Sequence, residues 1–247
     1  MAPGETRKEK KRIDVLLPDP RIPKHSCSIF FLTGAPYSGK TSTAELLVRE
    51  RPSLIHIVPD DVVRSLLEEG PDDVREYVQS RIANDPQGKV PEKLLFRILK
   101  IEISKHLFAA YGSDRFLIEG LPTSIEQYNK FQAAFGVVHA IVLNMHPDHI
   151  ERRAMADPMT FDEGERRLAM VRQRKEAWDE QMRAVIERPE FRRHSTWVDA
   201  SGPQEDVVWY IHDVIDAAVK LGPAKTPNLI GKMAQAITMP FLRKASQ

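Results

Sequence analysis

Short apolar runs alternate along the chain with longer segments in which apolar residues recur at helical spacing. Five runs have the length of buried strands: residues 29–32, 54–58, 115–120, 137–144 and 195–200. The helical segments begin at residue 41 and continue with residues 60–70, 72–85, 91–112, 124–136, 146–156, 162–188 and 203–222. This alternation is typical of a parallel sheet covered on both faces. The expected fold class is therefore α/β, with a five-stranded parallel sheet.

The pattern predicts one domain with an extension at each end. Residues 1–27 are charged, and prolines at positions 18, 20 and 23 favour extended chain outside the core. The domain itself is expected to span residues 28–221. Residues 222–247 contain no acid, several Lys or Arg and scattered apolar residues, as a basic amphipathic segment would. Such a tail can dock on a protein partner, lie on an anionic membrane or fold back on its own domain. Docking is favoured because the segment is short for stable membrane binding.

Composition narrows the class of protein without naming a function. The 247 residues carry a net charge of +1, which gives no reason to expect a nucleic-acid partner. Cys27 is the single cysteine, so an internal disulfide framework is excluded. No apolar run approaches the about 20 residues that span a bilayer, and the N-terminus does not resemble a signal peptide. We therefore expect no transmembrane segment and, by default, a cytoplasmic location.

The clearest motif follows the first strand, where residues 34–42 read GAPYSGKTS and fit G-x-x-x-x-G-K-[ST]. Glycines let the backbone turn sharply around an anion, and the helix that follows adds its positive end. An ordinary strand–turn–helix corner with a chance lysine is the alternative, but the strand before and the helix after favour phosphate binding. The expected ATP-binding residues of this loop are Gly34, Ala35, Pro36, Tyr37, Ser38, Gly39, Lys40, Thr41 and Ser42.

Two residues of this loop and one carboxylate elsewhere in the chain are candidates for contacts with phosphate and Mg²⁺. Lys40 can reach the outer phosphates, and the Thr41 hydroxyl is placed for Mg²⁺. Glu119 ends a buried strand, where an unpaired carboxylate is costly, and Mg²⁺ or Lys40 would relieve that cost. A carboxylate that caps the next helix is the alternative. Because ligands of such sheets sit at the carboxyl ends of the strands, Glu119 and the loop should meet.

Several motifs, in order, resemble those of the adenylate kinases and other nucleoside-monophosphate kinases. They are GAPYSGKT, PDDVVRSLLEEG, QGKVPEKLLFRIL, FLIEGLPTSIEQ, HIERRAMA and DEGERRL, and the likeness runs from about Ser28 to Leu221. It implies a P-loop nucleoside-monophosphate kinase-like fold, in which residues 59–91 bind the monophosphate and residues 152–167 form a short lid. The implied reaction is transfer of the γ-phosphoryl group of ATP to AMP with Mg²⁺.

The resemblance also implies roles for individual residues. Lys40 and Arg167 would act on the transferred phosphoryl group, Arg152 would stack on the ATP base, and Glu119 would lie near Mg²⁺. The implied monophosphate-binding residues are Arg64, Val90, Gly120 and Gln127, with Gln127 reading adenine.

Some positions depart from the family pattern. Thr123 stands where an arginine usually contacts the monophosphate, and the lid segment DPMTFD is short and carries no arginine. Because positive charge supplies most of the catalysis in phosphoryl transfer, these losses leave a second function open: a nucleotide-binding pseudoenzyme that serves as a structural or docking subunit. Arg153 and Arg166 could replace the missing cations. A P-loop kinase for another small acceptor is a third alternative, which Arg64 and Gln127 disfavour.

Overall fold

The computed structural model describes residues 7–110, 112–156 and 161–236, and within them five strands form one parallel sheet. The strands are β1 (Ser28–Gly34), β2 (Leu54–Ile57), β3 (Arg115–Glu119), β4 (Val137–Asn144) and β5 (Ser195–Asp199). Their order in the sheet is β2-β3-β1-β4-β5, and every neighbouring pair is parallel. The predicted α/β fold with a five-stranded parallel sheet is confirmed, and all five strands lie where the apolar runs place them.

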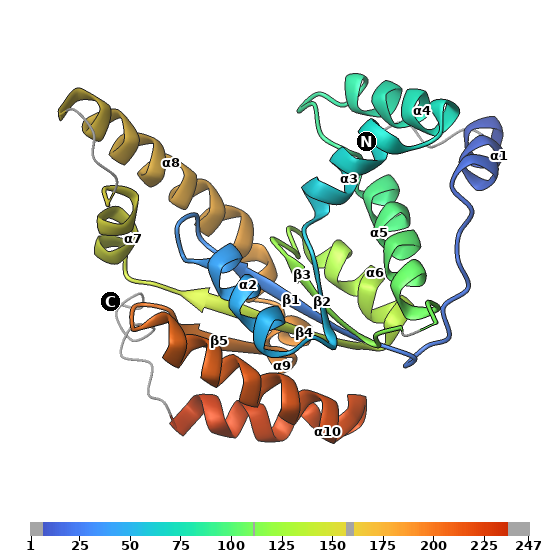
Figure 1. Cartoon of the computed structure of the whole chain (residues 1–247). Coiled ribbons are helices and arrows are strands. Elements are labelled where there is room, and N and C mark those ends of the chain that lie inside the picture. The colour runs from blue at the N-terminus through green and yellow to red at the C-terminus, as the bar shows by residue number, and fades with distance from the viewer. Residues whose placement is uncertain (1–6, 111, 157–160, 237–247) are drawn as a thin grey trace.

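Helices cover both faces of this sheet (Figure 1). They are α1 (Arg7–Leu16), α2 (Lys40–Glu50), α3 (Pro59–Glu69), α4 (Asp72–Ala83), α5 (Glu92–Leu107), α6 (Ile125–Phe135), α7 (Pro147–Ala154), α8 (Phe161–Ile186), α9 (Pro189–Arg193) and α10 (Gln204–Ala236). Side chains of β1 alternate between the faces: Phe30 and Leu32 pack toward α2 and α10, and Ile29 and Phe31 toward α5, α6, α8 and α9. Because β1 is buried on both sides, its central residues 29–32 are continuously apolar.

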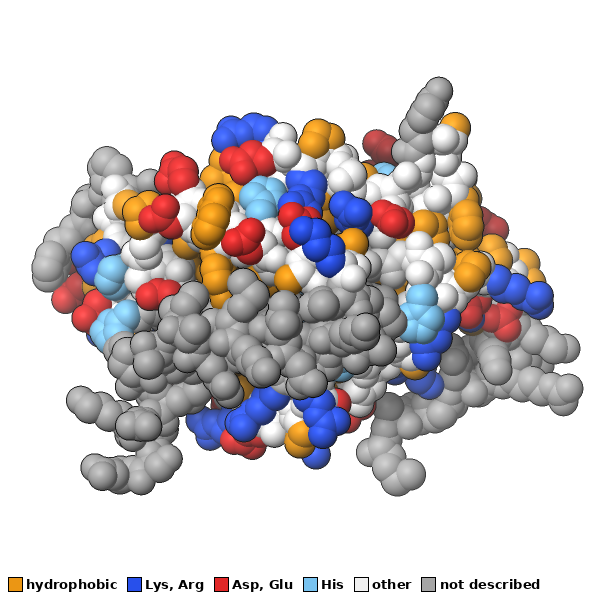
Figure 2. Space-filling view, turned by 90° about the horizontal axis from the view of Figure 1, so that it is seen from below, with side chains coloured by type: hydrophobic (Ala, Val, Ile, Leu, Met, Phe, Trp, Pro, Cys, Tyr) orange, Lys and Arg blue, Asp and Glu red, His pale blue; other side chains and the backbone are white. Residues whose placement is uncertain are grey.

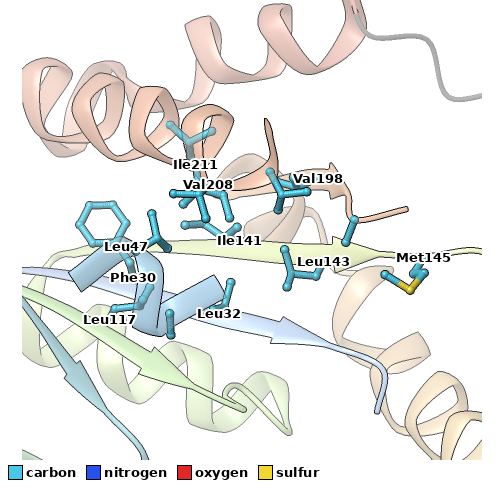
Figure 3. Packing of buried hydrophobic residues seen from close by; sticks show 14 of the residues in the cluster. Phe30, Leu32, Leu47, Leu117, Ile141, Leu143, Met145, Val198, Val208 and Ile211 are labelled. Carbon is cyan, nitrogen blue, oxygen red and sulfur yellow. The ribbon is translucent and has the colours of Figure 1, made fainter. Parts of the chain in front are cut away.

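Figure 3 shows the apolar core on the face of the sheet that α2 and α10 cover. Leu47 of α2 and Ile211 of α10 approach Phe30 and Ile141 of the sheet, and all four side chains are fully buried. Burial of a large apolar side chain stabilises the fold by about 1.5–3 kcal/mol. This packing fixes α2, and with it the loop that precedes α2, against the carboxyl end of β1.

The N-terminal extension differs from its expected form. Residues 18–23, which hold Pro18, Pro20 and Pro23, form neither helix nor strand, but residues 7–16 form α1. Ile13 and Leu17 are buried in a third apolar cluster with residues of α4 and α5. Asp14 pairs with Arg97 of α5 at 2.7 Å. The segment therefore packs on the α3–α5 region, although the sequence pattern placed it outside the core.

The C-terminal end also differs, because α10 continues to Ala236 and so takes in part of the segment expected to be a tail. Residues 237–247 lie outside the described residues, as do the side chains from Leu221 onward. The expectation of a docking tail at residues 222–247 therefore lies outside the described side chains. Where the chain is described, no helix combines the length and apolar character needed to cross a membrane. Basic and acidic side chains are interspersed over the described part of the face seen in Figure 2.

Candidate functional site

The glycine-rich loop joins β1 to α2 at the carboxyl edge of the sheet. A Cβ on Gly34 would lie 2.6 Å from the Ser38 Oγ and 2.8 Å from the Leu143 carbonyl oxygen, so only glycine fits there. Gly39 has φ 88°, in the left-handed region that favours glycine. No side chain caps α2, and its first turn carries no acidic residue. The unpaired N–H groups and the positive end of α2 are therefore available to an anion.

Lys40 is folded back onto this loop. Its Nζ donates hydrogen bonds to the carbonyl oxygens of Gly34 and Ala35, each at 3.0 Å. Burial lowers the pKa of Lys40, and the negative charge of Glu119 opposes that change. A phosphate bound in the loop would offer the ammonium group a charged partner in place of two neutral carbonyls.

Glu119 lies beside the loop, as its position at the end of β3 predicts. The Thr41 hydroxyl donates to Glu119 Oε1 at 2.6 Å, and His56 Nε2 lies 3.1 Å from Glu119 Oε2. Burial raises the pKa of Glu119, but the hydrogen bonds from His56 and Thr41 and the nearby positive charges outweigh it, so the net pKa is lowered. Glu119 is therefore ionised at neutral pH.

The alternative role for Glu119, as a helix cap, is not what the structure shows. Ser124 caps α6, and its Oγ accepts a hydrogen bond from the backbone N–H of Gln127 at 3.0 Å. His56, which does contact Glu119, was missed by the sequence analysis. The signal that could have found it is a single histidine within the otherwise apolar strand 54–58.

The neighbouring oxygens of Thr41 and Glu119 suit Mg²⁺, which prefers oxygen ligands. Within the described residues, no group of three or more His, Cys, Asp or Glu could hold a metal ion. A Mg²⁺ ion here would therefore draw most of its ligands from nucleotide phosphates and water, which is how this ion is usually bound in kinases.

A cavity of about 350 Å³ adjoins the outer side of the loop. Its lining residues are Tyr37, Ser38, Gly39, Ser42, Thr43, Arg153, Ala200, Gln204 and Val207. The guanidinium group of Arg153 donates to the carbonyl oxygen of Ala200 at 3.1 Å, and its Nη1 would lie 2.9 Å from a Cβ on Gly39. A planar cation therefore borders a cavity next to the phosphate loop, where the base of a bound nucleotide could reach.

The two other arginines expected near ATP take different positions. Arg152 is exposed, its Nε donates to the carbonyl oxygen of Asp148 at 3.3 Å, and it does not line the cavity beside Arg153. Arg167 donates to the carbonyl oxygen of Ala154 at 3.1 Å, which joins the start of α8 to the end of α7. Residues 157–160 of the expected lid lie outside the described residues.

The four residues expected to bind a monophosphate are spread over several elements. Arg64 is exposed on α3 and pairs with Asp61 at 2.9 Å. Val90 packs at the edge of the third apolar cluster. Gly120 has φ 79°, and its N–H donates to the carbonyl oxygen of Leu32 at 2.9 Å, which places it beside the end of β1. Of these, only Gly120 is thus tied by a hydrogen bond to the strand that leads into the loop.

Gln127, the fourth of them, is buried and already holds the turn after β3. Its Oε1 accepts hydrogen bonds from the backbone N–H of Thr123 at 2.7 Å and from the Thr123 hydroxyl at 3.3 Å. The Thr123 carbonyl oxygen in turn accepts from Gln181 of α8 at 3.2 Å. The side chain of Gln127 therefore has its amide N–H₂ left to offer a base.

A second cavity, of about 620 Å³, lies between α3 and α5. Its lining includes His56, Asp61, Ser65, Glu102 and Lys105. None of the four residues expected to bind the monophosphate lines it, so this space is distinct from the acceptor site that the resemblance implies.

No protein-family model matches the chain, but several known kinases are similar to it in sequence. Adenylate kinase isoenzyme 5 of Mus musculus is 25% identical over 196 residues, which cover 77% of this chain and 33% of that protein. The adenylate kinase of Nautilia profundicola is 32% identical over 100 residues, 40% of this chain and 48% of that enzyme. Probable UMP-CMP kinase 1 of Arabidopsis thaliana is 27% identical over 146 residues, 56% of this chain and 67% of that protein.

The matched part of this chain thus spans about a third of the mouse protein and about half of the bacterial enzyme. By sequence, the chain is similar to adenylate kinases and to a UMP-CMP kinase, and its five-stranded parallel α/β sheet is consistent with the fold of a P-loop nucleoside-monophosphate kinase.

Proposed function

We propose that this protein binds MgATP at residues 34–42 and transfers the γ-phosphoryl group to a nucleoside monophosphate, with AMP the first candidate. The observation that carries the proposal is the arrangement around α2. An uncapped helix N-terminus, a half-buried lysine whose partners are neutral carbonyls, and the Thr41–Glu119 pair all lie at one edge of the sheet. Together they suit a polyphosphate with its magnesium ion.

On the donor side, the loop N–H groups would bind the phosphates, and Lys40 would exchange its carbonyl partners for phosphate oxygens. Thr41 and Glu119 would hold Mg²⁺, which supplies charge neutralisation to the phosphates when it is bound. The base would enter the 350 Å³ cavity, where Arg153 offers a planar cation to stack on. We therefore assign the base contact, which the resemblance gave to Arg152, to Arg153.

On the acceptor side, an oxygen of the monophosphate would attack the γ-phosphorus while the bond to the β–γ bridging oxygen breaks. The acceptor is already an oxyanion, so no general base is required. Arg64 would hold its phosphate after release from Asp61, and the amide N–H₂ of Gln127 would donate to an acceptor atom of the base. AMP is favoured because two of the relatives are adenylate kinases, and the UMP-CMP kinase relative keeps pyrimidine monophosphates as candidates.

Calorimetric titration with MgATP tests the donor half of this proposal. We expect saturable binding by the wild-type protein and a loss of about 100-fold or more in Lys40→Ala, because that change removes the cation facing the outer phosphates. Glu45→Ala, on the exposed side of α2, is the matched control and should bind as the wild type does. Equal binding by wild type and Lys40→Ala would contradict the proposal.

A second candidate function is that of a docking subunit that binds nucleotide without turnover. The residues expected around the acceptor monophosphate favour it. Thr123 provides no cation, and Arg64 is exposed and paired with Asp61. Both functions predict MgATP binding, so turnover separates them. Product formation with any nucleoside monophosphate supports the enzyme, and its absence in a folded sample that binds MgATP supports the docking subunit.

A further inference from the structure

The phosphate loop contains a residue in an unfavourable backbone conformation. Tyr37 has φ 62°, and among the described residues His25 is the one other non-glycine residue with positive φ. A tyrosine in the left-handed region brings its Cβ close to the following carbonyl oxygen, which makes the conformation costly. Such strain persists where the surrounding structure imposes it and is concentrated at ligand-binding sites. The position therefore raises the question of what its side chain contacts.

The side chain of Tyr37 makes few contacts with the rest of the fold. Tyr37 is 37% exposed, and no hydrogen bond or aromatic contact joins its side chain to another described residue. Tyr37 lines the 350 Å³ cavity together with Arg153 and Gln204. The same cavity is bordered by Gly39 and Ser42 of the phosphate loop. An uncommitted aromatic ring is thus held within reach of any base whose phosphates occupy the loop.

We propose that Tyr37 contacts the base of the donor nucleotide and, with Arg153, makes the cavity selective for a purine triphosphate. This inference rests on the proposed function and deepens it, because it concerns the same site. Aromatic rings stack on every base, and a guanidinium group stacks on planar rings in the same way. A purine presents a larger face than a pyrimidine, so MgATP and MgGTP should bind more tightly than MgCTP and MgUTP.

The test compares ligands with and without a base. Tyr37→Gly and Tyr37→Phe are titrated with MgATP and with magnesium tripolyphosphate, which occupies the loop but has no base. Glycine adopts φ 62° without strain, so Tyr37→Gly should fold at least as stably as the wild type. His25→Gly is the matched control, because it relieves the other left-handed position, at the N-terminal side of β1 and away from the loop.

We expect Tyr37→Gly to bind MgATP about tenfold more weakly than the wild type, with a raised or unchanged melting temperature and unchanged binding of tripolyphosphate. Tyr37→Phe and His25→Gly should bind MgATP as the wild type does. Equal weakening of both ligands in Tyr37→Gly would assign the effect to the shape of the loop and overturn the proposal. Unchanged MgATP binding in that variant would overturn it as well.

These outcomes are distinct from a failure of the proposed function. If the wild type binds neither MgATP nor tripolyphosphate, the phosphate site itself is absent and the proposed function fails. If the wild type binds both ligands and Tyr37→Gly binds them equally well, the phosphate site stands and the role of Tyr37 is refuted.

Discussion

Glu119 shows how a single side chain joins two strands to the phosphate loop. It lies at the end of β3, accepts a hydrogen bond from Thr41 of α2, and contacts His56 of β2. These interactions outweigh the effect of burial, so the pKa of Glu119 is lowered in the folded protein. A carboxylate whose pKa falls on folding stabilises the protein above its unfolded pKa, and that contribution is lost as the pH falls toward the folded pKa.

Replacement of Glu119 by Gln tests this contribution. At pH 7 we expect Glu119→Gln to lower the free energy of unfolding by about 1–3 kcal/mol, because hydrogen bonds to a charged acceptor are lost. The difference between wild type and variant should narrow below about pH 4.5, as the wild-type carboxylate becomes protonated. Urea denaturation at several pH values between 3.5 and 7 measures it. A difference that stays constant across this range would show that the charge of Glu119 contributes nothing.

Substitution of Thr123 by arginine tests whether the lack of a cation at this position limits the rate of phosphoryl transfer. The N–H and carbonyl groups of Thr123 bond to Gln127 and Gln181, and both contacts survive a change of side chain. Thr123→Arg should therefore keep the turn after β3 and add a positive charge near the acceptor. We expect the rate of phosphoryl transfer to rise about tenfold or more. Thr123→Gln, which adds length without charge, is the control. No gain in the arginine variant would mean that another cation already acts there.

At the scale of single residues, the sequence predicted that Glu119 lies beside the phosphate loop. It did not predict that Arg153 borders the loop or that His56 contacts Glu119. The glycine spacing and the ends of strands are local signals, and they place Lys40, Thr41 and Glu119 correctly beside one another. Arg152 and Arg153 are adjacent on one helix, and consecutive helical residues point about 100° apart, so a motif match cannot decide which one faces the loop. The contact of His56 with Glu119 spans 63 positions and depends on how β2 and β3 pair.

At the level of elements, the sheet could be predicted and the first helix could not. Buried parallel strands are rich in apolar residues, and the sequence shows a short, largely apolar run at each of the five strands. Helix α1 reads RKEKKRIDVL and is mostly charged, so its composition indicates a solvent-exposed segment. Its buried residue Ile13 lies four positions before Leu17, and their burial depends on α4 and α5, which are far along the chain. The packing of α1 on the domain thus depends on tertiary contacts, which local composition does not reveal.

A pair of substitutions on α1 tests its contribution to stability. Ile13 is 6% exposed and Val15 is 79% exposed on the same helix. We expect Ile13→Ala to lower the free energy of unfolding by about 2–4 kcal/mol, because it leaves a cavity in the third apolar cluster. Val15→Ala should change it by less than about 0.5 kcal/mol. Equal effects of the two changes in urea denaturation would show that α1 does not pack as described.

Across the whole molecule, two groups of helices stand on either side of the phosphate loop. Figure 1 shows α7 and α8 on one side of α2 and α3 and α4 on the other, with the sheet below them. The first group carries Arg152, Arg153 and Arg167, and the second carries Arg64. Donor and acceptor nucleotides would thus be held by separate groups of helices and meet above the carboxyl edge of the sheet.

Product formation by the purified protein tests the proposed reaction most directly. MgATP is supplied with AMP, CMP, UMP or GMP in separate reactions, and Lys40→Ala serves as the blank. We predict turnover of at least about 1 per second with one monophosphate, AMP first, because that is the lower end of typical enzyme rates. The product should disappear in the blank. A folded wild-type protein that binds MgATP but forms no product with any of the four would contradict the kinase function and leave the docking subunit.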